Sequence, residues 1–362
     1  MQSSFPPERR AISPGRATLA RWKGQRFRIS LFVAICLICC GAAGAYTFHS
    51  VRHSESARQA IARSDSSDLA GQLASIASQP HLLFLQSDGS FFRQIAVTPL
   101  GGDGQTLVSS RLCQRVYYRT GRGLCLGKDY QGGAFIFDSN LNVLHEIDID
   151  GVPSRVRISP DGRFGAMTVF VAGHSYSDIG FSTRTAIVDM ESGAFVISNL
   201  EDLAVTKDGR RFESQDFNFW GVTFAADSNR FYATLGSGGK TYLIQGDVSQ
   251  RQAQTLKENV ECPSLSPDGA RLVFKKRFTR SPLTIDWQLY VLDLQSLTER
   301  PLVETRSVDD QVEWLDDAHV LYYLHDEGPP STIRPDVWVA PVDDDSPPRQ
   351  LWTRAFSPSV VR

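Results

Sequence analysis

The sequence has almost no surplus of charge of either sign. Its 362 residues include 38 Lys and Arg against 40 Asp and Glu, which gives a formal net charge of −2. Proteins that bind nucleic acid present clustered positive charge to the phosphates. The charge balance therefore gives no electrostatic case for a nucleic-acid partner.

Signatures of catalytic and metal sites are lacking as well. No Gly-x-Ser-x-Gly motif, which carries the nucleophile of α/β-hydrolases, is present. Between residues 82 and 362 only His319 and His325 lie close together, and no Cys or carboxylate stands beside them at metal-ligand spacing. We therefore expect no metal and no cofactor.

Cysteine is scarce outside one apolar run. Of six cysteines, Cys36, Cys39 and Cys40 lie in that run, while Cys113 and Cys125 flank a predicted hairpin with its turn near residues 120 and 121. Pairing across this turn places Cys125 opposite about position 116, so Cys113 would point to the other face of the hairpin. We therefore expect no structural disulfide.

What the sequence does contain is a repeat, and its clearest copies are two identical turns. Ser159–Gly162 and Ser266–Gly269 both have the sequence Ser-Pro-Asp-Gly, with apolar residues on either side. Proline fixes φ at the second turn position, aspartate can bond the local backbone, and glycine accepts a positive φ. Each segment is therefore predicted to be the turn of a β-hairpin.

Weaker copies of this turn set the period of the repeat. Measured at the second turn residue, the copies lie at positions 120, 160, 226, 267 and 316, so the spacings are 40, 66, 41 and 49 residues. A propeller blade of four strands repeats about every 40 to 45 residues. A second pair of strand-like runs follows each turn. We therefore predict blades of four antiparallel strands, with one long insertion.

The two ends of this region supply the sixth blade. Residues 82–110 contain three strand-like runs but no innermost strand before them. The C-terminal segment Phe356–Val361 resembles the missing strand, because Pro358-Ser359-Val360 parallels Pro263-Ser264-Leu265. A sheet that joins both ends closes the ring without exposed edges. The predicted fold class is all-β, a six-bladed β-propeller over residues 82–362.

The repeat carries a family resemblance. Pro263–Phe274, with the sequence Pro-Ser-Leu-Ser-Pro-Asp-Gly followed by an apolar run, is similar to the repeat signature of the TolB-type six-bladed β-propellers of bacterial cell envelopes. The resemblance covers residues 82–362. It implies a non-enzymatic protein-interaction platform in the periplasm. The α/β domain that precedes the propeller in the family's namesake has no counterpart before residue 82.

A candidate membrane segment precedes the predicted propeller. Ile29–Phe48 is a run of twenty uncharged residues, long enough to cross a hydrocarbon core of about 30 Å. Seven basic residues and the single acid Glu8 precede it, so the positive-inside rule predicts a cytoplasmic tail over residues 1–28 and a propeller on the periplasmic or extracellular side. The alternative is a signal peptide cleaved after Ala43-Gly44-Ala45 and a secreted protein. The long basic lead favours an uncleaved transmembrane helix.

Residues 49–80 are predicted to be a polar tether, part of it helical. Its few larger apolar residues, Ile61, Leu69, Leu73 and Ile76, would form one thin stripe on a helix. A thin stripe of this kind is expected to pack on its own domain.

Two surfaces are candidate sites for a ligand or partner. At the channel mouth, opposed charges and an aromatic rim would suit a peptide or another polar ligand; the candidate residues are Arg155, Arg157, Trp220, Glu261 and Glu313. The long insertion, residues 171–184 and 203–219, contains Phe217 and Phe219, and long loops on a rigid scaffold often bind partners. The alternative for the channel is that its polar groups satisfy one another through ordered water.

Two functions remain open at this point. The favoured one is a non-enzymatic protein-interaction module, tethered to the membrane, with an envelope protein or peptide as its partner. The alternative is a carbohydrate-active enzyme, a lyase or hydrolase, with its site at the channel. Histidine clusters or paired carboxylates at the ends of inner strands would favour the enzyme, and the sequence offers only Glu261 and Glu313 there.

Overall fold

The computed structural model describes residues 32, 36, 41, 68–87, 91–101, 106–127, 132–171, 182–281, 284–325 and 335–362. The chain divides into two units, residues 1–63 and 64–362. Most of the predicted membrane segment Ile29–Phe48 lies outside the described residues, and only Phe32, Cys36 and Gly41 are described, with helical backbone. No helix in the described ranges is long and apolar enough to span a membrane.

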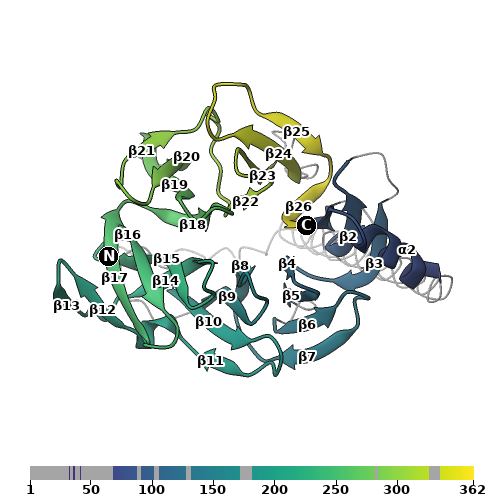
Figure 1. Ribbon diagram of the computed structural model, residues 1–362, viewed down its shortest axis with the longest axis horizontal. Helices are drawn as coiled ribbons and strands as arrows, with labels where there is room; N and C mark the ends of the chain where they lie inside the picture. Colours follow the sequence, from purple (N-terminus) through teal and green to yellow (C-terminus); the bar gives the residue numbers. More distant parts are fainter. Residues whose placement is uncertain are drawn as a thin grey trace, which may run out of the picture. The chain divides into compact units, whose positions relative to one another are not determined.

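The second unit contains six sheets arranged as blades around a central axis (Figure 1). The first blade is β26 (Ala355–Val361), β1 (His81–Gln86), β2 (Gln94–Pro99) and β3 (Leu107–Leu112), from the axis outward. The second is β4 (Arg115–Arg119), β5 (Arg122–Leu126), β6 (Ala134–Asp138) and β7 (Val143–Ile147). The third is β8 (Val152–Ile158), β9 (Phe164–Val171), β10 (Ser182–Asp189) and β11 (Phe195–Ile197).

The remaining blades complete the ring. The fourth is β14 (Asn218–Phe224), β15 (Arg230–Ser237), β16 (Lys240–Asp247), β17 (Gln252–Glu258), β12 (Ala204–Lys207) and β13 (Arg210–Phe212). The fifth is β18 (Glu261–Leu265), β19 (Arg271–Ser281), β20 (Thr284–Asp293) and β21 (Glu299–Pro301). The sixth is β22 (Glu313–Trp314), β23 (His319–His325), β24 (Pro335–Pro341) and β25 (Arg349–Trp352). The predicted fold, a six-bladed β-propeller, is confirmed.

The predicted turns join the inner strand to the second strand in the second to sixth blades. In Ser159–Gly162, the N–H of Gly162 donates to the carbonyl of Ser159 at 2.9 Å, and Gly162 has a φ of +77°. The carboxylate of Asp161 accepts from the hydroxyl of Ser159 and from the N–H of Arg163. These turns all lie at one end of the channel, which we call the turn face. The second strands end, and the third strands begin, at the other end of the channel, which we call the loop face.

The ring closes through the C-terminal strand. β26 pairs antiparallel with β1, with Leu82 opposite Val360, and it occupies the inner position that the sequence predicts. Its serines also reach the neighbouring inner strand β4. The Ser357 hydroxyl bonds the N–H and carbonyl of Val116, and the Ser359 hydroxyl bonds those of Tyr118. The seam between first and second blades is therefore hydrogen-bonded on both sides of β26.

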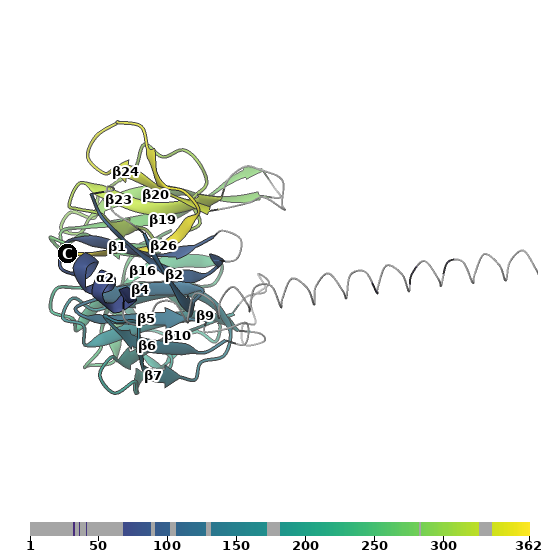
Figure 2. The same ribbon diagram turned by 90° about the vertical axis from the view of Figure 1, so that its right-hand side faces the viewer.

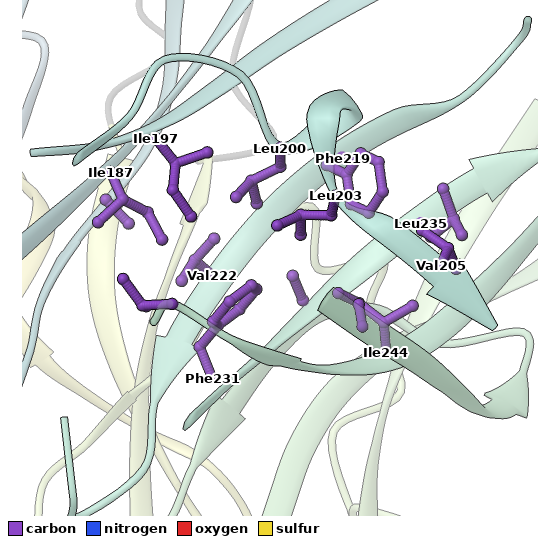
Figure 3. Packing of buried hydrophobic residues seen from close by; sticks show 14 of the residues in the cluster. Ile187, Ile197, Leu200, Leu203, Val205, Phe219, Val222, Phe231, Leu235 and Ile244 are labelled. Atoms are coloured by element: carbon purple, nitrogen blue, oxygen red, sulfur yellow. The ribbon is translucent and has the colours of Figure 1, made fainter. Parts of the chain in front are cut away.

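The long insertion extends the fourth blade, which departs from the predicted four strands. η2 (Leu200–Asp202) leads into β12, which pairs in parallel with β17 and antiparallel with β13. Val205 of β12 and Leu200 join a core with Phe219 and Ile244 between the third and fourth blades (Figure 3). The insertion adds strands because its alternating residues continue the apolar face of this sheet. Its other part, residues 172–181, lies outside the described residues.

The expectation of no disulfide is wrong. Cys113 and Cys125 form one, with a Cα–Cα distance of 5.7 Å. The predicted register of the hairpin holds, since Val116 lies opposite Cys125. Cys113, however, is not in the hairpin: its N–H bonds the carbonyl of Arg93, so it follows β3 at the edge of the first blade. The disulfide thus links the connection between two blades to β5.

A short helix from the predicted tether packs on the first blade. α2 (Asp68–Ala77) lies beside this blade in both views (Figures 1 and 2). Leu73 and Ile76 are buried against Leu85, Ile95 and other core residues of the blade. The prediction that the apolar stripe packs on its own domain is confirmed for these two residues. The side chain of Leu69 and all of Ile61 lie outside the described residues.

Candidate binding site in the propeller channel

One arginine crosses the channel between opposite blades. Arg157 lies on β8 of the third blade, and its Nη2 donates to the carbonyls of Gln311 and Val312 before β22 of the sixth blade, at 3.1 and 2.7 Å. The residue is only 9% exposed. Because its guanidinium N–H groups already bond the opposite blade, Arg157 links two blades across the channel.

Gln311 makes a second crossing at the same level. Its Nε2 donates to the carbonyl of Val222 in the fourth blade at 3.0 Å and to that of Pro263 in the fifth blade at 2.8 Å. Gln311 is 5% exposed, and its Oε1 has no hydrogen-bond partner among the described residues. Together the two side chains link four blades through backbone carbonyls.

A buried carboxylate, Glu313, lies beside Arg157. Glu313 on β22 accepts from the hydroxyl of Tyr117 at 3.2 Å and from the N–H of Val360 at 3.3 Å, and its other oxygen is 3.7 Å from Arg157. Burial raises the pKa of Glu313, and the charge of Arg157 opposes the rise. Burial and then the charge of Glu313 raise the pKa of Tyr117 to about 12. The carboxylate therefore bonds Tyr117 and Val360 and lies close to Arg157 on the channel wall.

A cavity of 360 Å³ opens beside Arg157 and Glu313 on the turn face. Arg157, Glu313 and Tyr117 form its base, and Arg119, Thr120, Pro160, Ser266, Pro267 and Arg362 are among the residues of its rim. Tyr118, Phe224 and Trp314 supply aromatic wall, with the indole of Trp314 donating to the carbonyl of Ser264. Sites of this size hold small ligands or a few residues of a peptide.

Arg119 is the one cation at this rim that makes no hydrogen bond or ion pair within the described ranges. It is exposed at the end of β4, and its charge, together with that of Arg157, opposes the rise that burial causes in the pKa of Glu313. Arg362, by contrast, donates to the carbonyl of Leu315. A guanidinium that no carboxylate contacts directly, next to aromatic and hydroxyl groups, suits an anionic or strongly polar segment of a ligand.

The loop-face mouth has a different character, because its charges are paired. Arg155 lies 3.4 Å from Asp309, which also bonds Lys275. Burial acts to raise the pKa of Asp309, but the charges of Lys275 and Arg155 outweigh it, so this pKa lies below its usual value. Burial raises the pKa of the neighbouring Asp310. Ion pairs therefore line this mouth.

The structure separates the residues that the sequence singled out. Arg157 and Glu313 line the turn-face cavity, whereas Arg155 lies at the loop-face end. Glu261, 3% exposed, pairs with Arg277 at 3.0 Å and accepts from the indole of Trp287. It is an anchor within the fifth blade.

The aromatic candidates are buried. Phe217 and Phe219 belong to the core between the third and fourth blades, since alternate residues leading into and along β14 face that interface. Trp220 is 8% exposed, and its ring lies so close over Gly236 that an added Cβ there would be 2.8 Å from it. Sequence reasoning missed Arg119 and Tyr118. Their signal was position, since they are the last residues of an inner strand before its turn.

In the described part of the chain, no group of three or more His, Cys, Asp or Glu is arranged to hold a metal ion.

No family model matches the sequence, and no curated protein matches it. Among solved structures, TolB from Acinetobacter baumannii is similar, with a TM-score of 0.54 and 13% identity over 79% of this chain and 68% of that chain. The chain has a TolB-like fold.

Two further solved structures are similar to this chain. A chain of the nidogen/laminin complex is similar with a TM-score of 0.51 and 10% identity, over 78% of this chain and 98% of that one. Oligogalacturonate lyase in complex with manganese is similar with a TM-score of 0.43 and 10% identity, over 70% and 72%. At these identities the likenesses show the fold alone.

Proposed function

We propose that this chain is a non-enzymatic interaction module of the cell envelope, held at the membrane by Ile29–Phe48, and that it binds a protein partner in the turn-face cavity. The observation that carries the proposal is a 360 Å³ cavity with the buried side chains of Arg157, Glu313 and Tyr117 at its base and, at its rim, Arg119, which makes no hydrogen bond or ion pair in the described ranges. A cavity of this form favours a ligand that enters from the turn face, such as a loop or an end of a polypeptide.

The groups around the cavity favour a partner segment that carries a carboxylate together with aromatic or aliphatic side chains. Arg119 offers a charge-assisted hydrogen bond to a carboxylate. Tyr118, Phe224 and Trp314 offer apolar wall, and aromatic residues and arginine are the residue types that contribute most at protein interfaces. Glu313 and Arg157 both bond other blades, which supports a structural role for the two side chains.

Export of the propeller is supported by two independent features. The seven basic residues before Ile29 favour a cytoplasmic N-terminus. The disulfide between Cys113 and Cys125 is of a kind that forms and persists in oxidising compartments such as the periplasm. Both features support a propeller on the far side of the membrane from the N-terminus.

The proposal is tested by purifying the intact chain from envelope extracts together with whatever binds it. We compare the parent with Arg119→Glu and with Arg349→Glu, which makes the same charge change on an exposed arginine of the outermost strand of the sixth blade. The partner should be recovered with the parent and with Arg349→Glu. Recovery with Arg119→Glu should fall at least about tenfold, since loss of a charged hot-spot contact costs about 2 kcal/mol.

Two results contradict the proposal. One is a partner that is recovered equally with all three forms, which would place binding elsewhere on the blades. The other is turnover of a polysaccharide by the purified chain, because that activity would replace the interaction module by a lyase or hydrolase.

A further inference from the structure

The turn-face cavity contains one acidic side chain among several cations. Among the residues that line it, Glu313 is the only Asp or Glu, whereas Arg119, Arg157 and Arg362 carry positive charge. No histidine is among these lining residues. An ionised carboxylate opposes the binding of an anionic segment to a cavity that otherwise attracts anions. The protonation state of Glu313 therefore affects which ligands the cavity binds.

The two oxygens of this carboxylate differ in their contacts. Oε1 accepts from the Tyr117 hydroxyl on β4 and from the Val360 N–H on β26, so it joins the sixth blade to the second and the first. Oε2 accepts no hydrogen bond in the described ranges, and Nη2 of Arg157 lies 3.7 Å from it. That nitrogen already donates to the carbonyls of Gln311 and Val312. Oε2 is therefore the oxygen that can bind a proton or a ligand.

The groups that face Glu313 come from the other inner strands around the channel axis (Figure 1). Burial raises the pKa of Glu313, and it outweighs the opposing effects of the Arg157 charge, the Val360 N–H, the Arg119 charge and the Tyr117 hydroxyl. These groups belong to β4, β8 and β26. The strands β18 and β23 also pack against β22, and neither contributes a charged or titratable side chain to the lining of the cavity.

A ligand that brings an anion to Arg119 also brings negative charge toward Glu313. Two like charges in one partly desolvated site favour protonation of one of them. We propose that Glu313 takes up a proton from solvent when an anionic segment of the partner enters the turn-face cavity, and that its Oε2–H then donates a hydrogen bond to that segment. The inference rests on the proposed function, because it assumes that this cavity binds an anionic segment.

The direction of the pH dependence follows from the linkage between proton binding and ligand binding. The anion makes the pKa of Glu313 higher in the complex than in the free protein, so binding takes up a proton at pH values between the two. The affinity for an anion should therefore rise as the pH falls through the pKa of the complex, and it should level off below the pKa of the free protein. One proton changes the affinity by at most about tenfold per pH unit.

The test uses the purified full chain and two small probes that share a ring and differ in charge. Between about pH 5 and pH 8, benzenesulfonate stays anionic and benzylammonium stays cationic. Their affinities are measured by ligand-observed NMR titration, with Arg119→Glu as the reference that removes binding at the rim. From the alkaline to the acid end of this range, we expect the affinity for benzenesulfonate to rise about tenfold. Benzylammonium should bind more weakly than benzenesulfonate at the acid end.

The variant Glu313→Gln separates the proton from the rest of the site. The carboxamide is uncharged at every pH, its oxygen can still accept from Tyr117 and Val360, and its N–H can donate to the anion without a proton from solvent. This variant should bind benzenesulfonate at the alkaline end as tightly as the parent does at the acid end, with no change in between. Glu258→Gln makes the same change at an exposed residue of β17, outside the cavity lining, and should retain the pH dependence of the parent.

Two results overturn the inference and leave the cavity standing as a binding site. One is an affinity for benzenesulfonate that does not change with pH, and the other is a pH dependence that persists in Glu313→Gln. Tighter binding of benzylammonium than of benzenesulfonate at the acid end also overturns it, because the cavity would then select cations.

The absence of any benzenesulfonate binding that Arg119→Glu removes overturns both the inference and anion recognition by the cavity. If Glu313→Gln does not fold, the pH dependence of the two probes with the parent decides the question by itself. None of these results depends on the recovery of a protein partner.

Discussion

The seam that closes the ring offers the sharpest test of the architecture. Ser359 on β26 is 0% exposed, and its hydroxyl both accepts from the N–H of Tyr118 at 3.0 Å and donates to the carbonyl of Tyr118 at 3.1 Å. Tyr118 belongs to β4, the inner strand of the second blade. The change Ser359→Ala removes a single oxygen and leaves two buried backbone groups without partners at the point where the chain's two ends meet.

The expected loss in the free energy of unfolding follows from those two backbone groups. A buried polar group that loses its partner costs about 1 to 3 kcal/mol, so the free energy of unfolding should fall by about 3 kcal/mol. The methyl group of alanine fits where the serine stood, so no clash adds to this figure. For a unit of this size each kcal/mol shifts the melting temperature by about 2 °C, and we expect a drop of about 6 °C.

The assay is equilibrium unfolding by urea, followed by tryptophan fluorescence, with thermal unfolding as a second measure. Ser198→Ala is the matched control, because Ser198 is exposed and its hydroxyl makes no hydrogen bond in the described ranges. The control should stay within about 0.5 kcal/mol of the parent. If Ser359→Ala does the same, the serine contacts do not seal the ring and the reasoning is refuted.

Three further predictions concern stability. Cys113→Ser opens a disulfide with a sequence separation of 12 residues and should lower the free energy of unfolding by about 3 kcal/mol; urea unfolding of the non-reduced parent is the reference, and no difference would mean that the bond is not formed. Burial acts to raise the pKa of Glu304, but hydrogen bonds from Arg306 outweigh it and hold the pKa below 4.5. The pair therefore contributes stability that is present above pH 4.5 and lost as the pH falls through the folded-state pKa. Glu304→Gln should cost about 2 kcal/mol at pH 7, with the difference from the parent shrinking below pH 4.5 in pH-dependent urea unfolding; a constant difference would contradict the linkage. Gly221 has a φ of +67°, and a Cβ there would lie 2.7 Å from the Cα of Cys262, so Gly221→Ala should lower stability by more than about 2 kcal/mol, and a variant as stable as the parent in the same assay would show that β14 and β18 can separate.

The fold could be predicted because its signals are local and repeated. Each turn is marked by residues that favour particular backbone angles, as Asp161 and Gly162 do. In the strands on either side, apolar and polar residues alternate. Even the closing strand was visible, since Ser359 stands in a pattern shared with an internal blade. The insertion was harder, because strands β12 and β13 are only four and three residues long and have no turn of the same type between them.

The candidate site was predictable only in part, because position along an inner strand does not tell which contacts a side chain makes. Arg157 and Glu313 were found by charge, yet each bonds residues of other blades. Trp220 looked like a rim aromatic but packs on Gly236 of its own sheet. The disulfide was missed because Cys113 belongs to a connection between blades, whose path no local register fixes.

The central claim, that a protein partner enters the turn-face cavity, is tested most directly by photo-crosslinking in growing cells. A photoreactive amino acid is placed at position 120, on the rim of the cavity, or at position 206, on an exposed strand of the fourth blade. The account predicts a discrete adduct from position 120 that disappears in the Arg119→Glu background, and none from position 206. An adduct from position 206 alone, or one from position 120 that is indifferent to Arg119, would contradict it.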